Sequence, residues 1–292
     1  MSSRRAESRY SGCLPEQVKP EPAPPKVSVI VVSHNRAALL RRCLEALEGS
    51  EARDTLQIVV IDNGSTDGSQ QMEPDFSNIR FMRLPRNFGL TKALNIGIRA
   101  ADADYLFLLH DDTEVTPGVV SALAAALDAQ PEVGAVCPLL VDEAGQPAPQ
   151  VSDLPPDGVW EPLEPAPEPL EVDYATGAAL MFRSFFFKAM RQIDEHYGQF
   201  GSDAELCFRI RSAGKKILVL PDVRALHHGR QDTSTLRRAD FQIGRSVFIR
   251  KHAGFIAGIQ ARLGAAFRAL GGLRLGEFTS VISGQKIDGT QG

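Results

Sequence analysis

The sequence predicts an α/β fold with an irregular second half, followed by a helical C-terminal tail. Two observations predict it. Runs of β-branched residues alternate with helical patterns up to residue 139, and a proline-rich stretch then interrupts this order. The length of 292 residues fits one large domain or two smaller ones. Hydrophobic residues make up 43% of the chain and charged residues 23%, which excludes a collagen-like, coiled-coil or wholly disordered protein.

A strand, a helix and a second strand open the predicted fold. The run Val27–Ser33 is continuously apolar, as expected for a parallel strand that is buried on both faces. Leucines at helical spacing follow, and Gly49 ends that helix. A second β-rich run, Leu56–Asp62, completes one βαβ unit.

The same alternation then repeats. Strands are predicted over Asn78–Leu84, Asp104–Asp112 and Val133–Leu139, and helices over Leu90–Ala101 and Thr116–Gln130. This order is typical of a sheet whose strands are mainly parallel.

The segment 138–173 differs in composition from everything before it. It holds nine prolines and nine acidic residues but no lysine or arginine, so we expect a loop. Regular structure returns with a strand over Tyr174–Phe182, a helix from about 203 to 213 and a short strand over Lys216–Pro221.

The net charge of −4 conceals segments of opposite sign. Residues 27–229 carry 17 basic and 29 acidic residues, whereas residues 230–274 carry nine and two. An acidic body without a recognition motif argues against nucleic acid as a partner. In the basic tail, arginines alternate with apolar residues such as Phe255 and Phe267, as in a helix that lies on an anionic membrane surface. A packed C-terminal helix or a homodimer contact explains this pattern at least as well.

Residues 1–25 are polar and end in PEPAPP, so we expect a disordered lead-in. The N-terminus has no apolar core of a signal peptide, and no apolar run reaches the roughly 18 residues of a spanning helix. The four cysteines lie far apart without metal-ligand spacing, which favours reduced thiols. We therefore expect a cytoplasmic protein, with the tail available for contact with the inner face of the membrane.

Polar residues gather where the predicted strands end, which is where open α/β sheets bind their ligands. The strand ends read SHNR (33–36), DNGSTDGS (62–69) and HDDTE (110–114). No glycine-rich phosphate loop follows the first strand, which argues against dinucleotide-binding and P-loop proteins. Asp111 and Asp112 are costly to hold side by side as anions without a cation, and carboxylate oxygens suit Mg²⁺ or Mn²⁺.

These motifs occur together in one known family. The chain carries, in the family's order over about residues 27–229, VSVIVVSHNR, IVVIDNGSTDGS, RNFGLTKALNIGIRAADADYLFLLHDDTEVTP, YATGAALMF and IDEHYGQFGSDAELCFRIRSAGKKILVLPDVRALHHG. It thereby resembles the family 2 inverting glycosyltransferases of the GT-A fold, rhamnosyltransferases in particular. The resemblance implies a metal-dependent enzyme of cell-surface polysaccharide or glycolipid synthesis. Such an enzyme moves a sugar with inversion from a UDP or dTDP donor to a hydroxyl of a glycan or lipid-linked acceptor.

The resemblance also implies which residues bind the donor. Asp62 matches the aspartate that contacts the nucleobase, and Ser33 and Asn35 line the same pocket. Asn87 belongs to a loop near the donor, and Asp111 is placed to meet the ribose or a metal-bound water. From the sequence alone, Asp62 and Asn87 are also good turn formers.

Two further matches concern the metal. Asp112 corresponds to the metal carboxylate, and His227, rather than His228, to a histidine near the metal or the diphosphate. The chain departs from the family pattern at His110, where an acidic residue or asparagine is usual. Imidazole suits Mn²⁺ better than Mg²⁺, and both ions stay open.

Asp203 matches the catalytic base, the carboxylate that takes the proton of the acceptor hydroxyl as it attacks. The family's commoner form is Glu-Asp, and this chain has Ser202 before the aspartate. Asp203 also suits the N-cap of its helix. The departures at His110 and Ser202 motivate a second hypothesis, a catalytically impaired nucleotide-sugar-binding or scaffold protein of the same fold.

The resemblance divides the chain into functional parts. It implies a single large domain of the GT-A type. Residues 26–137 are expected to form a Rossmann-like nucleotide-sugar-binding half, residues 138–229 a mixed-sheet acceptor-binding and catalytic half, and residues 230–292 the basic helical tail. For the acidic loop 138–173, a variable solvated insertion is preferred to a cover for the acceptor.

Overall fold

A computed structural model describes residues 26–190, 192–229 and 234–286 of the chain. The expected lead-in at 1–25 lies outside the described residues, as do the first four and the last six residues of the tail.

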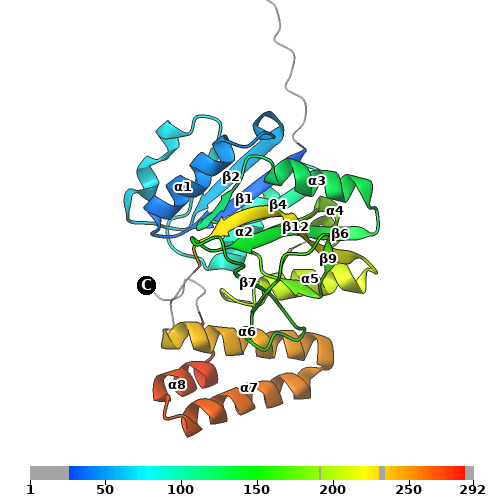
Figure 1. Ribbon diagram of the computed structural model, residues 1–292. Helices are drawn as coiled ribbons and strands as arrows, with labels where there is room; N and C mark the ends of the chain where they lie inside the picture. Colours follow the sequence, from blue (N-terminus) through cyan, green and yellow to red (C-terminus); the bar gives the residue numbers. More distant parts are fainter. Residues whose placement is uncertain (1–25, 191, 230–233, 287–292) are drawn as a thin grey trace, which may run out of the picture.

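A nine-stranded mixed sheet forms the centre of the protein (Figure 1). Its strand order is β3-β2-β1-β4-β11-β6-β12-β5, with β9 paired to β12. A small second sheet has the order β10-β7-β8. The strands are β1 (Val27–Ser33), β2 (Leu56–Asp62), β3 (Arg80–Arg83), β4 (Tyr105–His110), β5 (Thr113–Val115), β6 (Val133–Val141), β7 (Pro149–Ser152), β8 (Glu161–Pro162), β9 (Leu170–Glu171), β10 (Tyr174–Ala175), β11 (Ala179–Arg183) and β12 (Lys216–His227).

Helices cover both faces of this sheet (Figure 1). They are α1 (Ala37–Glu48), α2 (Leu90–Arg99), α3 (Val119–Ala129), α4 (Ser184–Met190), α5 (Ser202–Ser212), α6 (Thr235–Ala253), α7 (Phe255–Gly271) and α8 (Leu275–Ser283). Helices α1 and α3 pack on one face, and α2 and α5 on the other. The strand β1 supplies Val29 and Val31 to the first core and Ile30 to the second, because successive strand residues point to opposite faces. The predicted double-sided burial of Val27–Ser33 is confirmed.

The strand directions account for the position of the polar residues. β1, β2, β3 and β4 run parallel, so their carboxyl ends meet at one edge. The strand β11 is antiparallel to both β4 and β6, which makes the sheet mixed as predicted. β12 runs parallel to β6 and antiparallel to β5, with His227 opposite Thr113. The end of β12 therefore returns to the edge at which β4 ends.

Several elements differ from the prediction. The strand predicted over Tyr174–Phe182 is divided into β10 and β11, which belong to different sheets. The strand predicted over Asp104–Asp112 stops at His110, because the chain must turn through Asp111 and Asp112 before β5 can pair with β12. The strand predicted over Lys216–Pro221 continues to His227 past an irregularity in its pairing with β6. The segment 138–173 is not loop throughout, since it contributes the end of β6 and all of β7, β8 and β9.

The tail is helical in its described part, as predicted (Figure 1). Helix α6 lies against the body, where the Phe248 ring meets the Phe208 ring of α5 edge-on at 5.6 Å. Helices α7 and α8 pack on the side of α6 that faces away from the sheet (Figure 1).

Candidate active site

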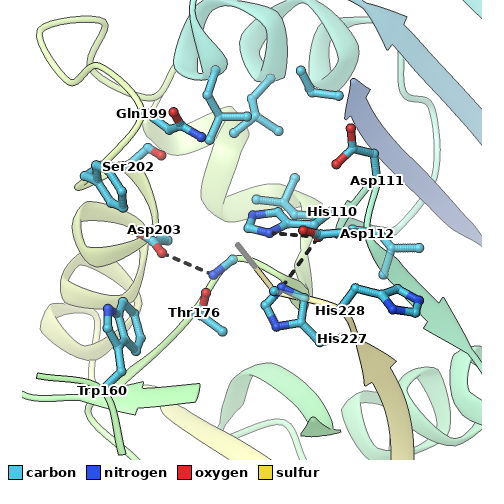
Figure 2. Close-up of a pocket in the computed structure, with 18 of the residues that line it drawn as sticks. His110, Asp111, Asp112, Trp160, Thr176, Gln199, Ser202, Asp203, His227 and His228 are labelled. Carbon is cyan, nitrogen blue, oxygen red and sulfur yellow. Dashed lines mark hydrogen bonds and ion pairs between the residues drawn. The ribbon is translucent and has the colours of Figure 1, made fainter. Parts of the chain in front are cut away.

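A cavity of about 410 Å³ lies where β4 and β12 end, and its walls come from both halves of the body and from α6. Figure 2 shows two groups of side chains that face each other across it. His110, Asp112 and His227 lie on one side, and Ser202 and Asp203 on the other. The cavity thus joins strand-end residues of the first half to residues of α5.

His110, Asp112 and His227 each offer one ligand atom, and these three atoms lie within 4.8 Å of one another. Asp112 Oδ1 is 3.5 Å from His227 Nε2 and 3.8 Å from His110 Nδ1. The side chain of His227, and not that of His228, therefore lies beside the Asp112 carboxylate. Two imidazoles and a carboxylate converge as they do at sites for first-row divalent metal ions.

The state of Asp112 fits a cation at this position. Among the described residues Asp112 Oδ1 is buried and accepts no hydrogen bond, although a buried polar oxygen normally has a partner. Burial opposes ionisation of this carboxyl, but His227, His110 and Arg36 together hold its pKa well below the usual range. A buried, ionised carboxylate with an oxygen that accepts no hydrogen bond fits the role of a metal ligand.

Asp111 is bound to the end of β1. Its Oδ2 accepts a hydrogen bond of 2.8 Å from Ser33 Oγ, and its Oδ1 is 2.7 Å from Arg36 Nη1. The same guanidinium nitrogen lies 3.0 Å from Asp112 Oδ2. Arg36 therefore supplies the positive charge that lets the two aspartates lie next to each other.

Asn35 and Asp62 hold together the loops that follow β1 and β2. Asn35 has φ 53 and accepts a hydrogen bond of 2.7 Å from Thr66 N through its side chain. Asp62 is buried, and its Oδ1 accepts a hydrogen bond of 2.9 Å from Ser65 N. The turn-forming role foreseen for Asp62 is thus present in the structure.

Asn87 belongs to the same loop network. Its Oδ1 accepts hydrogen bonds from Asn63 Nδ2 at 2.9 Å and from Gly89 N at 2.8 Å, just before α2 begins. The side chains of Ser33, Asn35, Asp62 and Asn87 are therefore gathered at the carboxyl ends of β1 and β2. These four side chains do not line the cavity, whereas Arg36 and Asp111 beside them do.

Asp203 reaches the cavity from the first turn of α5. Its Oδ1 accepts a hydrogen bond of 2.9 Å from Tyr174 Oη, and its Oδ2 one of 3.2 Å from Gly177 N. Desolvation by the cavity walls raises the pKa of Asp203, and the hydrogen bonds offset only part of that shift. The N-cap role is wrong, because α5 begins at Ser202 and Gly201, with φ 102, occupies that position.

Glu205, two residues after Asp203 in the first turn of α5, joins this helix to the tail. Its carboxylate is buried and contacts Arg209 Nε at 2.6 Å, His252 Nε2 at 2.7 Å and Lys251 Nζ at 2.9 Å. Burial opposes its ionisation, but the contacts with Arg209, His252 and Lys251 lower its pKa to about 2. Lys251 and His252 come from the distant helix α6, so the sequence pattern indicated Glu205 only as an acid in the first helical turn.

Several side chains of the cavity had no role assigned from the sequence. Trp160 lines it from the segment 138–173, so the interpretation of that segment as a solvated insertion is incomplete. Phe200 lines it together with Arg237, whose guanidinium lies 4.7 Å from the centre of the Phe200 ring. Arg36 could have been found, because it ends the motif SHNR at a strand terminus. The sequence around Trp160 offers no comparable signal.

His228 has a different environment from His227. Its Nε2 is 2.6 Å from Glu114 Oε1, and its Nδ1 is 2.9 Å from Glu143 Oε1. These contacts attach the end of β12 to β5 and to the chain that follows β6. His228 therefore fixes the backbone beside His227.

Comparison with known proteins identifies relatives of the chain. The family model described as glycosyl transferase family 2 matches residues 28–192, more than half of the sequence. The N-acetylglucosaminyl-diphospho-decaprenol L-rhamnosyltransferase of Mycobacterium tuberculosis is 28% identical over 238 residues, which cover 70% of this chain and 76% of the relative. The GalNAc(5)-diNAcBac-PP-undecaprenol β-1,3-glucosyltransferase of Campylobacter jejuni is 31% identical over 105 residues, covering 34% of this chain and 33% of that enzyme.

Solved structures share the fold. GalNAc-T7, crystallised with UDP, GalNAc and Mn²⁺, superposes with a TM-score of 0.63 at 19% identity and covers 82% of this chain. The present chain spans half of the GalNAc-T7 chain. Staphylococcus aureus TarS 1–349 with UDP-GlcNAc superposes with a TM-score of 0.60 at 16% identity, covering 89% of this chain and 73% of that one. At these identities the likeness concerns the fold alone, and it confirms the expected GT-A architecture.

In the described residues, no helix combines the length and the apolar character that crossing a membrane requires.

Proposed function

The chain belongs to glycosyl transferase family 2 and is a glycosyltransferase, and we propose that it moves a sugar from a nucleoside diphosphate to an acceptor hydroxyl with inversion at the anomeric carbon. One observation carries the proposal: Asp203 faces the group His110, Asp112 and His227 across a single cavity. A base and a diphosphate-binding group on opposite sides of the reacting carbon are what a direct displacement requires.

The proposed base is Asp203. As the acceptor oxygen bonds to the anomeric carbon, the bond from that carbon to the diphosphate breaks, and the hydroxyl proton passes to Asp203. Attack from the side opposite the leaving group inverts the configuration and needs no covalent enzyme intermediate. The raised pKa of Asp203 makes it a better proton acceptor than a solvated aspartate. Tyr174 and Gly177 N hold its carboxylate in one orientation.

Asp112, His110 and His227 would hold a divalent cation, Mn²⁺ or Mg²⁺. Such an ion balances the charge of the departing diphosphate when it is bound. The unused Asp112 Oδ1 supports this assignment, and the two imidazoles favour Mn²⁺ over Mg²⁺. Mn²⁺ is also present in the structure of GalNAc-T7.

The donor is proposed to bind at the carboxyl ends of β1 and β2, in the half formed by residues 26–137. Ser33, Asn35, Asp62 and Asn87 would shape the nucleoside pocket, and Asp111 would meet the ribose. We propose UDP or dTDP as the nucleotide. TarS was crystallised with UDP-GlcNAc, and the Mycobacterium tuberculosis relative is a rhamnosyltransferase.

The acceptor is proposed to enter through residues 138–229 and to be a glycan or a lipid-linked sugar of cell-surface polysaccharide or glycolipid synthesis. The names of the Mycobacterium tuberculosis and Campylobacter jejuni relatives both specify acceptors on a polyprenyl diphosphate. An acceptor with such an anchor would bring the enzyme to a membrane surface.

The helix α7 supports contact with an anionic membrane. Its small residues, among them Gly258 and Ala265, are buried, while its large apolar residues are exposed. The exposed set, called here the apolar stripe, is Phe255, Ile256, Ile259, Leu263, Phe267 and Leu270. Between residues 234 and 286 the chain has nine lysines and arginines, and both of its carboxylates, Asp240 and Glu277, are buried. An exposed apolar stripe on a unit whose exposed charges are all positive is typical of a helix that lies on anionic lipid.

We place this surface on the cytoplasmic side of the membrane, where Cys43, Cys137 and Cys207, all buried and free, would stay reduced. A second copy of the chain is the competing occupant of the apolar stripe, and a vesicle-binding measurement distinguishes the two.

A second candidate, an impaired nucleotide-sugar-binding or scaffold protein, is motivated by His110 and Ser202. Incubation with UDP- and dTDP-sugars, Mn²⁺ and a panel of glycan and polyprenyl-diphosphate acceptors separates the two functions. An active enzyme releases free nucleoside diphosphate in proportion to the glycosylated acceptor. Binding of the sugar nucleotide without either product would establish the second candidate.

A further inference from the structure

Trp160, the single tryptophan of the chain, lines the cavity on the same side as Asp203 (Figure 2). Its ring packs on Tyr174, with the ring centres 4.9 Å apart at an angle of 56°. Tyr174 in turn donates its hydrogen bond to Asp203. Tyr174 thus contacts both Trp160 and Asp203, and it holds the aromatic surface at a fixed position relative to the proposed base.

The turn that carries Trp160 is attached to helix α6. Arg245 Nε of α6 donates a hydrogen bond of 2.9 Å to Pro156 O. Gly158, with φ +92, lies so close to Phe241 of α6 that an added Cβ would come within 2.9 Å of its ring. Because both contacts involve the backbone of the turn, Trp160 is held in place before any ligand binds. A binding surface that is ordered in advance saves the entropy of ordering it.

The surroundings of Trp160 match a sugar ring. A pyranose has C–H groups on its faces and hydroxyl groups around its rim, so it needs a flat apolar surface with polar groups at the edge. Trp160 supplies the flat surface, and Phe200 adds a second aromatic wall. Asp142 and Gln199 also line the cavity and contribute polar side chains to its wall.

We propose that Trp160 is the platform on which a pyranose ring of the acceptor stacks, and that this stacking presents the acceptor hydroxyl to Asp203. The proposal rests on the proposed function and makes it more specific. The acceptor is a saccharide, whatever its anchor, and not an acyclic alcohol or a hydroxyl of a protein side chain.

Tryptophan fluorescence tests the platform without any turnover, since Trp160 is the sole source of the signal. Titration with methyl β-N-acetylglucosaminide should shift or quench the emission with saturation, whereas glycerol at the same concentrations should not. A saccharide titration that matches the glycerol titration would overturn the proposal. This result does not depend on activity, so it is separable from a failure of the proposed function.

Kinetics with a saccharide acceptor provide the second test. Trp160→Leu should raise the acceptor KM roughly three- to tenfold, as loss of an aromatic stacking contact predicts. Trp160→Phe keeps an aromatic ring and should have an acceptor KM close to that of the wild type. Phe185→Leu is the matched control, because Phe185 is exposed on α4 outside the cavity. The unfolding temperatures of the variants and the wild type should be measured as well, to test whether a folding defect causes the change in KM. Equal acceptor KM values for Trp160→Leu and Phe185→Leu would contradict the platform.

Discussion

The phenolic hydroxyl of Tyr174 donates a hydrogen bond of 2.9 Å to Asp203 Oδ1, which connects β10 to the first turn of α5. Desolvation raises the pKa of Asp203, and this hydrogen bond opposes the shift because it stabilises the ionised form. Tyr174 therefore sets how strongly the proposed base binds a proton.

Tyr174→Phe should shift the pH dependence of transfer. Without the hydroxyl the pKa of Asp203 rises further, and a base works only above its pKa. The acidic limb of the kcat/KM profile should move to higher pH by about one unit. Tyr105→Phe is the matched control, since Tyr105 donates a hydrogen bond of 2.6 Å to Asp128 outside the cavity. If the acidic limb of the Tyr174→Phe profile does not move, Asp203 is not the group that accepts the proton.

Removal of a proposed metal ligand should weaken Mn²⁺ binding. We expect His110→Ala and Asp112→Asn to lower Mn²⁺ affinity on the order of 100-fold in calorimetric titrations, because each removes one of three converging ligand atoms. A chelator should abolish transfer by the wild type. His196→Ala serves as the control, since 72% of the His196 side chain is exposed. Wild-type affinity in His110→Ala would show that the imidazole is not a ligand.

Glu205→Gln should lower stability in a pH-dependent way. The pKa of Glu205 falls from 4.5 to about 2 on folding, so the ionised form stabilises the fold above pH 4.5 and this contribution is lost as the pH falls toward 2. The variant should lose about 3 kcal/mol of unfolding free energy at pH 7, and less below pH 4. Urea denaturation of the wild type and the variant at pH 7 and at pH 3 measures the unfolding free energy.

The exposed Glu45 on α1 provides the control for that series, as Glu45→Gln should be neutral at every pH. A loss of stability in Glu205→Gln that is equal at pH 7 and at pH 3 would mean that the charge of Glu205 is not the stabilising factor.

Loss of the apolar stripe should release the enzyme from anionic lipid. The double variant Ile256→Ser/Phe267→Ser removes two exposed side chains of α7 and should weaken sedimentation with phosphatidylglycerol vesicles at least about tenfold. Phe185→Ser removes an exposed aromatic residue from α4 and should leave vesicle binding intact. The contrary result has two parts: the wild type does not bind vesicles and sediments as a dimer, and the double variant sediments as a monomer. That result would show that the apolar stripe contacts a second copy of the chain.

The sequence was informative where function depends on strand order. Parallel strands end at one edge, so SHNR, DNGSTDGS and HDDTE could be brought together from their positions alone, before any contact was known. The pairing of β12 with β5 was not predictable in this way. Through this pairing β12 continues six residues beyond the predicted end of the strand, and its last residue, His227, lies next to Asp112.

The features of the site that could not be predicted from the sequence depend on tertiary packing. Trp160 reaches the cavity because its turn is attached to α6, about 85 residues further along the chain. Glu205 looked like an ordinary first-turn acid, yet its partners His252 and Lys251 come from the end of α6. Neither relation produces a local periodicity or motif. The raised pKa of Asp203 likewise depends on walls that only the folded chain supplies.

The central claim is that Asp203 takes the proton of the acceptor, and the transfer rate of Asp203→Asn tests it most directly. Asparagine keeps the size and the hydrogen bond from Tyr174 but cannot accept a proton at neutral pH. Asp173→Asn, at an aspartate whose side chain is 57% exposed, controls for the loss of a charge. We expect Asp203→Asn to bind donor and Mn²⁺ like the wild type and to lose transfer by at least about 100-fold. Transfer at the wild-type rate in this variant would contradict the account.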